Sequence, residues 1–274
     1  MMSKRTILTF CFLLGTAGLV SAQLPIEQRV DHFRCYFTPR LPVEQSPTVL
    51  QDQFDVATKT VERINQLQII RLCNPVIKIT PDGKITPIVN RNHHLTMFRF
   101  NPQPVVPRIA LIRNQFGDQT ITIRDAGVLA VPTGKAKLPN PAPAPSADLD
   151  HYKCYSASGQ AVNKVVALKD QFTSEPVRVL EPIGFCNPTR KADAGAVFGV
   201  KNADAHLACY VTTPSQFPGI AVNIANQFVK RPIRVLKPDI LCVPSLKLQW
   251  APVLGVTANP GASGTPVEET PEQP

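Results

Sequence analysis

The sequence predicts an all-β protein with two tandem domains, each a small β-sandwich or barrel built from two copies of a repeat of about 41 residues. Three features of the 274 residues lead to this prediction: a residue pattern that recurs four times, apolar residues that alternate with a period of two, and cysteines that follow the recurring pattern. The composition excludes other classes. The 28 prolines argue against a coiled coil, the 14 glycines show no collagen triplet, and 43% hydrophobic residues argue against a wholly disordered chain.

The N-terminus has the features of a secretory signal peptide. Two cations, Lys4 and Arg5, precede a short apolar stretch over residues 7–20, and small residues follow up to Ala22. The apolar stretch is shorter than the roughly 20 residues that span a bilayer, and no later run is long enough for a transmembrane segment. We therefore expect a signal peptide over residues 1–22, cleaved after Ala22, and a mature chain that is secreted or periplasmic.

The charge balance of the mature chain is basic. Without residues 1–22 it contains 27 basic and 20 acidic residues. This excess could favour an anionic polymer of the cell envelope or the extracellular space, or it could simply be a solvated basic surface. The mature chain has no dense Lys/Arg block interleaved with aromatic residues, so specific nucleic-acid binding is not expected.

One residue pattern recurs in four segments, which we call units 1 to 4. Each unit opens with a His-containing pentapeptide, at His32–Tyr36, His94–Phe98, His151–Tyr155 and His206–Tyr210. Each then reaches an Asp/Asn-Gln-Phe motif, at residues 52–54, 114–116, 170–172 and 226–228. Each closes on Cys-Asn-Pro, Ala-Val-Pro or Cys-Val-Pro, at residues 73–75, 130–132, 186–188 and 242–244. The distance from the opening His to the Gln is 20 or 21 residues in every unit, and unit 1 carries five extra residues between 55 and 70.

The composition between units 2 and 3 indicates a domain boundary. Residues 136–149 are rich in Pro and Ala, which is typical of a semi-rigid extended linker. The sequence thus predicts β domain 1 over residues 31–135 and β domain 2 over residues 150–249. A short segment, 23–30, precedes the first domain, and a disordered tail is expected over residues 250–274.

Alternating apolar residues predict strands on both sides of each Gln-Phe motif. The inward face of the strand before the motif carries the residues four and six positions ahead of each Phe: Thr48, Leu50, Ala110, Ile112, Val166, Leu168, Val222 and Ile224. The strand after the motif is expected at residues 120–124, 176–180 and 232–236, whereas its register in unit 1 cannot be assigned. No segment has an apolar stripe with helical period, so no helix is expected.

The Asp or Asn two residues before each Phe is predicted to form an Asx turn, in which its side chain accepts hydrogen bonds from backbone amides. Both residue types can do this, whereas a catalytic carboxylate would not tolerate Asn in two of the four units.

The cysteine pairing follows from a double loss in unit 2. Met97 and Ala130 stand where the other units have their opening and closing cysteines. If the two cysteines of a unit form a disulfide, one lost bridge explains both replacements. The expected pairs are therefore Cys35–Cys73, Cys154–Cys186 and Cys209–Cys242.

The repeated His-x-x-Cys spacing could suggest zinc, since both side chains are good ligands. On a strand, however, positions i and i+3 point to opposite faces, and cysteines are better used as disulfides in an oxidising compartment. His94 is also retained in the unit that lost its cysteine. We therefore expect structural histidines, no metal, no cofactor and no catalytic thiol.

The three repeated motifs together resemble a family of repeated domains of unknown function in exported bacterial proteins. The resemblance covers residues 31–247 approximately and implies no activity, ligand or catalytic residue. Met97 and Ala130 depart from the family pattern, so the closing segment of unit 2 is expected to be less tightly held.

The functional hypothesis is a non-catalytic binding or structural module of the cell envelope or extracellular space, because the notable residues are distributed over four units. The alternative is a secreted hydrolase or lyase with its active site between the two domains. Its candidate residues are the acids that have no counterpart in the other units, namely Asp118, Glu175 and Asp239.

Overall fold

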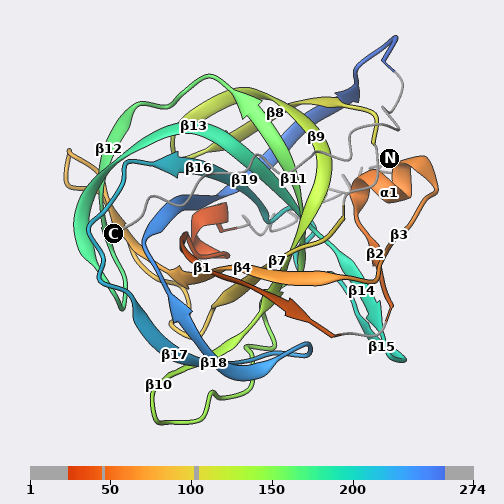
Figure 1. Cartoon of the computed structure of the whole chain (residues 1–274). Coiled ribbons are helices and arrows are strands. Elements are labelled where there is room, and N and C mark those ends of the chain that lie inside the picture. The colour runs from red at the N-terminus through yellow and green to blue at the C-terminus, as the bar shows by residue number, and fades with distance from the viewer. Residues whose placement is uncertain (1–23, 45–46, 102–104, 257–274) are drawn as a thin grey trace, which may run out of the picture.

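A computed structural model describes residues 24–44, 47–101 and 105–256 (Figure 1). The chain forms strands β1 to β19 over these ranges, together with one short 3-10 helix, η1 (Ile26–Gln28), and one short α-helix, α1 (Gln53–Thr58). The expected all-β class is therefore confirmed. The expected signal peptide and residues 257–274 of the expected C-terminal tail lie outside the described residues. The first residues of that tail are ordered, since residues 250–252 end strand β19 (Pro238–Pro252) and pair with residues 108–110.

Each unit contributes two strands to one closed ring. The opening pentapeptides lie in β1 (Phe33–Val43), β7 (Leu95–Arg99), β11 (Tyr152–Gly159) and β16 (His206–Thr212). The closing segments lie in β4 (Leu67–Pro75), β9 (Gly117–Pro132), β13 (Ser174–Pro188) and β19 (Pro238–Pro252). Neighbours pair antiparallel in the order β1, β4, β7, β9, β11, β13, β16 and β19, and β19 pairs with β1. The ring is closed because its last strand pairs with its first.

A hairpin lies between the opening and closing strands of each unit, with the Gln-Phe motif at its turn. The first strands of the hairpins are β2 (Thr48–Gln51), β8 (Arg108–Asn114), β12 (Lys164–Lys169) and β17 (Ile220–Ala225). They pair with β3 (Glu62–Ile64), the first half of β9, the first half of β13, and β18 (Lys230–Val235), respectively. The four strands predicted before the motifs therefore exist in the structure.

The other edge of each hairpin pairs with the unit two places away along the chain. Strand β2 of unit 1 pairs with β14 (Arg190–Asp193), which follows unit 3, and β12 of unit 3 pairs with β5 (Ile77–Ile79), which follows unit 1. Strand β17 of unit 4 pairs with β10 (Gly134–Lys137), which follows unit 2, and β8 of unit 2 pairs with the last part of β19. The short strands β6 (Ile85–Thr86) and β15 (Ala196–Phe198) extend β5 and β14 as hairpins.

The expected division into separate domains, 31–135 and 150–249, is not confirmed. The two halves meet edge to edge at β9–β11 and at β19–β1, so their strands form one sheet. Residues 136–149 do not act only as a spacer, since Lys137 pairs in β10 and Leu149 is buried in the core. The physical reason is that two half-rings would each expose unpaired strand edges, whereas closure pairs them all.

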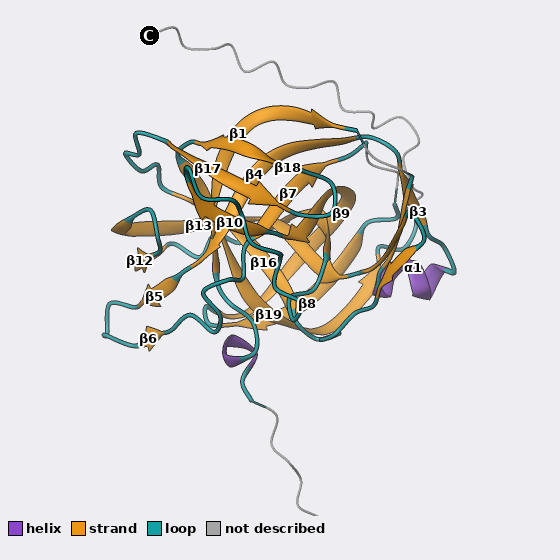
Figure 2. Cartoon of the chain, turned by 90° about the horizontal axis from the view of Figure 1, so that it is seen from below, coloured by secondary structure: helices purple, strands orange, loops and turns teal. Residues whose placement is uncertain are grey.

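Two apolar cores lie on the two faces of the ring. One contains the cysteines of all three bridges together with Phe33, Leu95 and Leu207, and it includes Ile26 beside η1. Helix η1 lies within the outline of the ring in Figure 1 and at one end of it in Figure 2, so it covers this end of the interior. The other core lies between the ring and the hairpins. It contains the apolar residues at the predicted inward positions of the hairpins, and Thr48, the polar residue among those positions, is buried as well.

Helix α1 was not expected from the sequence. It begins directly after Asp52, whose side chain accepts hydrogen bonds from the backbone amides of Phe54 and Asp55, while Asp55 accepts from the amide of Asp52. This reciprocal cap starts a helix without a long apolar stripe. The extra residues of unit 1 therefore enlarge its Asx turn into a helical turn. Within the described ranges, no helix has the length and apolar character needed to cross a membrane.

Candidate functional site

Three disulfides join directly paired residues of the opening and closing strands. They are Cys35–Cys73, Cys154–Cys186 and Cys209–Cys242, the pairs expected from the double loss in unit 2. Met97 and Ala130 occupy the equivalent paired positions in that unit. The bridges lie in the core that also contains Ile26, where each holds together the two ring strands of its own unit, 1, 3 or 4.

The Asp/Asn residues of the motifs form the predicted Asx turns in all four units. Each side chain accepts a hydrogen bond of 2.8–3.0 Å from the backbone amide of the Phe two residues later, at Asp52, Asn114, Asp170 and Asn226. The turn uses one oxygen of each side chain, which leaves the other oxygen or the amide nitrogen to reach a different unit.

That second atom contacts the unit two places away. The hydroxyl of Tyr155 donates to Asp52 over 2.8 Å, and the hydroxyl of Tyr36 donates to Asp170 over the same distance. In units 2 and 4 the amide of Asn114 donates to the Tyr210 hydroxyl over 2.8 Å. The fourth contact differs because unit 2 has Phe98 in place of Tyr, and there Asn226 donates to the hydroxyl of Thr133.

The motif phenylalanines make contacts between the same pairs of units, 1 with 3 and 2 with 4, which we call diagonal contacts. Each packs against the aromatic residue that follows the opening Cys position of the unit two places away, with ring centroids 5.2–5.5 Å apart: Phe54 with Tyr155, Phe172 with Tyr36, Phe116 with Tyr210 and Phe228 with Phe98. The repeated polar and aromatic residues thus connect units 1 with 3 and 2 with 4.

Four repeated lysines were missed by the sequence analysis. They lie five residues after each closing position, at Lys78, Lys135, Lys191 and Lys247, and the sequence signal was a Pro-x-x-Lys segment in every unit. Each ammonium lies over the motif Phe ring of the next unit in the ring, with unit 1 following unit 4, at 4.2–5.5 Å from the ring centroid. This geometry is that of a cation–π contact.

Burial lowers the pKa of Lys135 to about 7 and that of each of the other three lysines to about 8. Two of the ammonium groups also donate to asparagine side chains, from Lys135 to Asn74 over 2.5 Å and from Lys247 to Asn187 over 3.1 Å. These lysines therefore lie in the contacts between units.

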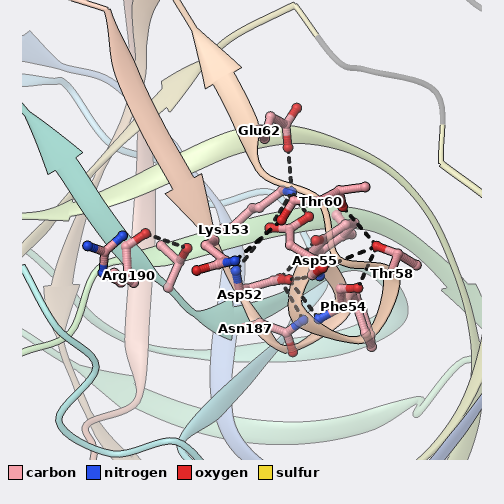
Figure 3. A network of polar contacts seen from close by, with 12 residues as sticks. Asp52, Phe54, Asp55, Thr58, Thr60, Glu62, Lys153, Asn187 and Arg190 are labelled. Carbon is pink, nitrogen blue, oxygen red and sulfur yellow. Dashed lines mark hydrogen bonds and ion pairs between the residues drawn. The ribbon is translucent and has the colours of Figure 1, made fainter.

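A buried charge cluster surrounds Lys153 (Figure 3). Its ammonium lies 2.9 Å from Asp55 and 2.5 Å from Glu62, while Asp52 is held by Tyr155. Burial raises the pKa of Asp55, and the charge of Asp52 raises it further, against the opposing effect of Lys153. The arrangement is a desolvated network that connects unit 3 to the hairpin of unit 1.

The same diagonal carries a second ion pair in the opposite direction. Arg34 of unit 1, at the position equivalent to Lys153, donates to Glu175 of unit 3 over 2.5 Å. Units 2 and 4 have Thr96 and Ala208 at this position, so no charge is placed there. Buried charge in this position is confined to the diagonal between units 1 and 3.

The three acids considered for a hydrolase or lyase each pair with a different arginine. Glu175 pairs with Arg34, Asp118 pairs with Arg113 over 2.7 Å at an exposed site, and Asp239 pairs with Arg71 over 2.5 Å. The structure thus places them in three ion pairs rather than in one common site.

The four repeated histidines are buried at the starts of the opening strands. Burial lowers the pKa of His32 and of His151 to about 3, and it lowers the pKa of His94 and of His206 well below the usual value. These rings are therefore neutral at physiological pH. The described part of the chain contains no cluster of three or more potential metal ligands among His, Cys, Asp and Glu.

His93, which is not part of the repeat, has a different environment. Its Nδ1 lies 2.8 Å from Asp31 and its Nε2 lies 3.0 Å from Asp148. Burial lowers its pKa, but the interactions with the two carboxylates outweigh burial, so the pKa is raised. The ring therefore connects the segment before unit 2 to Asp31, which precedes unit 1, and to Asp148, which precedes unit 3.

A cavity of about 730 Å³ lies beside His151, between the segment that leads into unit 3 and the segment that follows β15. Most of its lining is apolar: Pro132, Pro145, Ala147, Leu149, Val197, Phe198, Gly199 and Val200, with Ser146, His151, Lys201 and Gln227. A smaller cavity of about 330 Å³ lies between the β5–β6 hairpin, Gln115, Phe116 and β12. Small-molecule sites are typically 300–1,000 Å³, mostly apolar, with a few polar groups. The larger cavity has that size and composition.

Comparison with known proteins gave one family. A family model described as a repeat of unknown function (DUF7450) matches residues 93–244. Searches of curated proteins and of solved structures found no match.

Proposed function

The chain belongs to the family of repeats of unknown function, and from this premise we propose that it is an exported, non-catalytic binding module that holds an apolar small molecule in the cavity beside His151. The observation that carries the proposal is the contrast between two sets of residues. The repeated tyrosine, phenylalanine and Asp/Asn side chains are engaged in contacts between units, whereas the cavity has mainly apolar walls from outside the repeated motifs, with the repeated His151 and Gln227 among its polar groups.

Export is supported by two observations. The three disulfides would persist in an oxidising compartment outside the cytoplasm. The N-terminal residues have the charge and apolar pattern of a cleaved signal. A closed ring that is cross-linked by disulfides and by contacts between units provides a rigid scaffold. A rigid scaffold loses little conformational entropy when a ligand binds.

The cavity walls define the chemistry of the ligand. Phe198 packs against the ring of His151 with centroids 5.0 Å apart, and Leu149, in the segment that leads into unit 3, is buried. His151 is neutral at physiological pH and its Nε2 lies 3.2 Å from the amide nitrogen of Gln227. Such walls favour a largely apolar ligand with a ring that can lie against Phe198.

A fluorescence titration with N-phenyl-1-naphthylamine, an uncharged apolar fluorophore, tests the cavity. The native oxidised protein is expected to enhance the emission of this apolar probe, and Val200→Phe is expected to abolish most of that enhancement by filling the cavity. Val165→Phe is the matched control, because Val165 and Val200 are both 39% exposed and Val165 borders the smaller cavity. No enhancement by the native protein, or equal loss in both variants, would reject the proposal.

A further inference from the structure

The end of the ring remote from η1 carries a cluster of charged residues, here called the arginine cluster and defined as Arg40, Arg71, Arg99 and Asp239. Opening strands run away from η1, and closing strands run back towards it, because neighbours in the ring are antiparallel. Arg40 and Arg99 lie near the ends of opening strands β1 and β7. Asp239 lies near the start of closing strand β19, and Arg71 lies in the middle of closing strand β4, where it pairs with Phe37.

The arginine cluster breaks the symmetry of the repeat. The positions equivalent to Arg71 in units 2, 3 and 4 hold Val128, Gly184 and Ile240. Those equivalent to Arg99 in units 1, 3 and 4 hold Phe37, Ser156 and Val211. These guanidinium groups therefore lie at one part of the ring only, and they are not among the contacts that recur in the four units.

The geometry holds Arg71 in place and leaves its neighbours exposed. Two guanidinium nitrogens of Arg71 donate to both oxygens of Asp239 over 2.5–3.1 Å, and the guanidinium lies 4.5 Å from the centroid of the Phe37 ring. Arg40 and Arg99 are exposed on the strands at either side of β4. One oriented, partly buried guanidinium group and two exposed arginines therefore lie on three adjacent strands.

Positive charge at this end exceeds the charge of its acid. Burial lowers the pKa of Arg99, and the neighbouring charges of Arg40 and Arg71 lower it further. Lys237 adds a fourth cation next to Asp239, and its carbonyl accepts the backbone amide of Phe37 over 3.1 Å. An oxyanion placed between the arginines would relieve this repulsion, and guanidinium groups bind sulfate and carboxylate with two parallel hydrogen bonds.

We propose that the arginine cluster binds an acidic polysaccharide. Arg40 and Arg99 contact its sulfate or carboxylate groups, and Asp239, held by Arg71, accepts a hydrogen bond from a sugar hydroxyl. A mixture of donors and one fixed acceptor suits a chain that carries both acidic groups and hydroxyls. An anionic lipid surface offers a uniform negative field, which the carboxylate of Asp239 would oppose.

This inference rests on the proposed role as a binding module but not on the cavity, since no residue of the arginine cluster lines either cavity. The two proposals can therefore fail separately. The variant Val200→Phe should leave polysaccharide binding unchanged, and loss of the arginines should leave the fluorescence titration unchanged.

Calorimetric titration of the native protein with dextran sulfate, and with neutral dextran of equal length, tests the inference. The native protein should bind dextran sulfate and not dextran. The double variant Arg40→Gln/Arg99→Gln should bind it about tenfold more weakly or worse, as expected for lost charge-assisted hydrogen bonds. The control Arg63→Gln/Arg190→Gln removes the same charge from two exposed arginines on β3 and β14 and should keep most of the affinity.

Three results would overturn the inference. Equal weakening in both double variants would show that net charge alone determines binding. Equal binding of dextran and dextran sulfate would show that the anionic groups of the polysaccharide do not contribute to binding. Retention of the native protein on phosphatidylglycerol vesicles, lost with Arg40 and Arg99, together with no binding of dextran sulfate, would assign the cluster to a membrane surface.

Discussion

The hydroxyl of Tyr155 donates a 2.8 Å hydrogen bond to the buried carboxylate of Asp52, which lies 103 residues earlier in the chain. The bond joins the opening strand of unit 3 to the hairpin turn of unit 1. Its counterpart, from Tyr36 to Asp170, joins the same two units in the opposite direction. Pairs of this kind make the four units interdependent.

Replacing Tyr155 by Phe should therefore destabilise the whole fold. The change removes one hydrogen bond to a buried carboxylate, and a buried acceptor that loses a partner costs about 1–3 kcal/mol. Urea unfolding of the oxidised protein measures the loss. Tyr152→Phe is the matched control, because the hydroxyl of Tyr152 is buried and has no hydrogen-bond partner within the described residues. That variant should be neutral or slightly more stable, and an equal loss in both variants would contradict the interpretation.

A fourth disulfide should form in the double variant Met97→Cys/Ala130→Cys. These two residues pair directly across β7 and β9, as Cys35 and Cys73 do across β1 and β4. A bridge over this loop would stabilise the fold by about 2–4 kcal/mol on the chain-entropy model. Thiol counting under denaturing conditions and urea unfolding test the result, with the two single variants as controls. Two titratable thiols in the folded double variant would refute the expectation.

Replacing Lys153 by Met should be among the most damaging single changes. It leaves Asp55 and Glu62 buried next to each other without the ammonium that lies 2.9 and 2.5 Å from them. Breaking a buried ion pair by removing one partner costs about 3–5 kcal/mol. The loss should shrink at acidic pH, because protonated carboxyl groups need no counter-charge. Lys169→Met, at an exposed position of β12, serves as the control in urea unfolding at neutral and acidic pH. A loss for Lys153→Met that does not change with pH would argue against the charge cluster as its cause.

The stabilising effect of His93 should decrease as the pH rises. Its folded pKa is raised by Asp31 and Asp148 above the usual value of about 6.5. The protonated ring therefore stabilises the fold fully below about pH 6.5, and that contribution is lost as the pH rises through the folded pKa. The difference in unfolding free energy between the native protein and His93→Gln should be larger at mildly acidic than at alkaline pH.

His151 serves as the control, because its effect on stability should have the opposite pH dependence. Burial lowers its pKa to about 3, so the unfolded chain binds a proton that the folded chain does not between about pH 3 and 6.5. The native ring therefore costs stability as the pH falls through this range, and the difference between native protein and His151→Gln should grow with pH. The same pH trend for both histidine variants would show that the environments are not distinct.

Much of the local structure of this protein follows from the sequence. The residues ahead of each Phe are buried on the predicted face, and the Asx turns form at Asp52, Asn114, Asp170 and Asn226. The three disulfides join the cysteines that the double replacement at Met97 and Ala130 suggests. These features depend on neighbours in the chain or on comparison between units, and both can be read along a sequence. Helix α1 was missed because its cap acts through two side chains, Asp52 and Asp55, and not through an apolar stripe.

The repeated unit, its strands and most of the residues that it buries can be inferred from the order of residues along the chain. The closure of the four units into one ring is visible only in the folded structure. The same is true of the contacts between units 1 and 3 and between units 2 and 4, and of the four lysines that lie over the next unit's phenylalanines. Alternation along a strand reports which face is covered but not which strand lies at its edge. Edge partners depend on closing the sheet without unpaired backbone groups, a condition that involves all eight ring strands together.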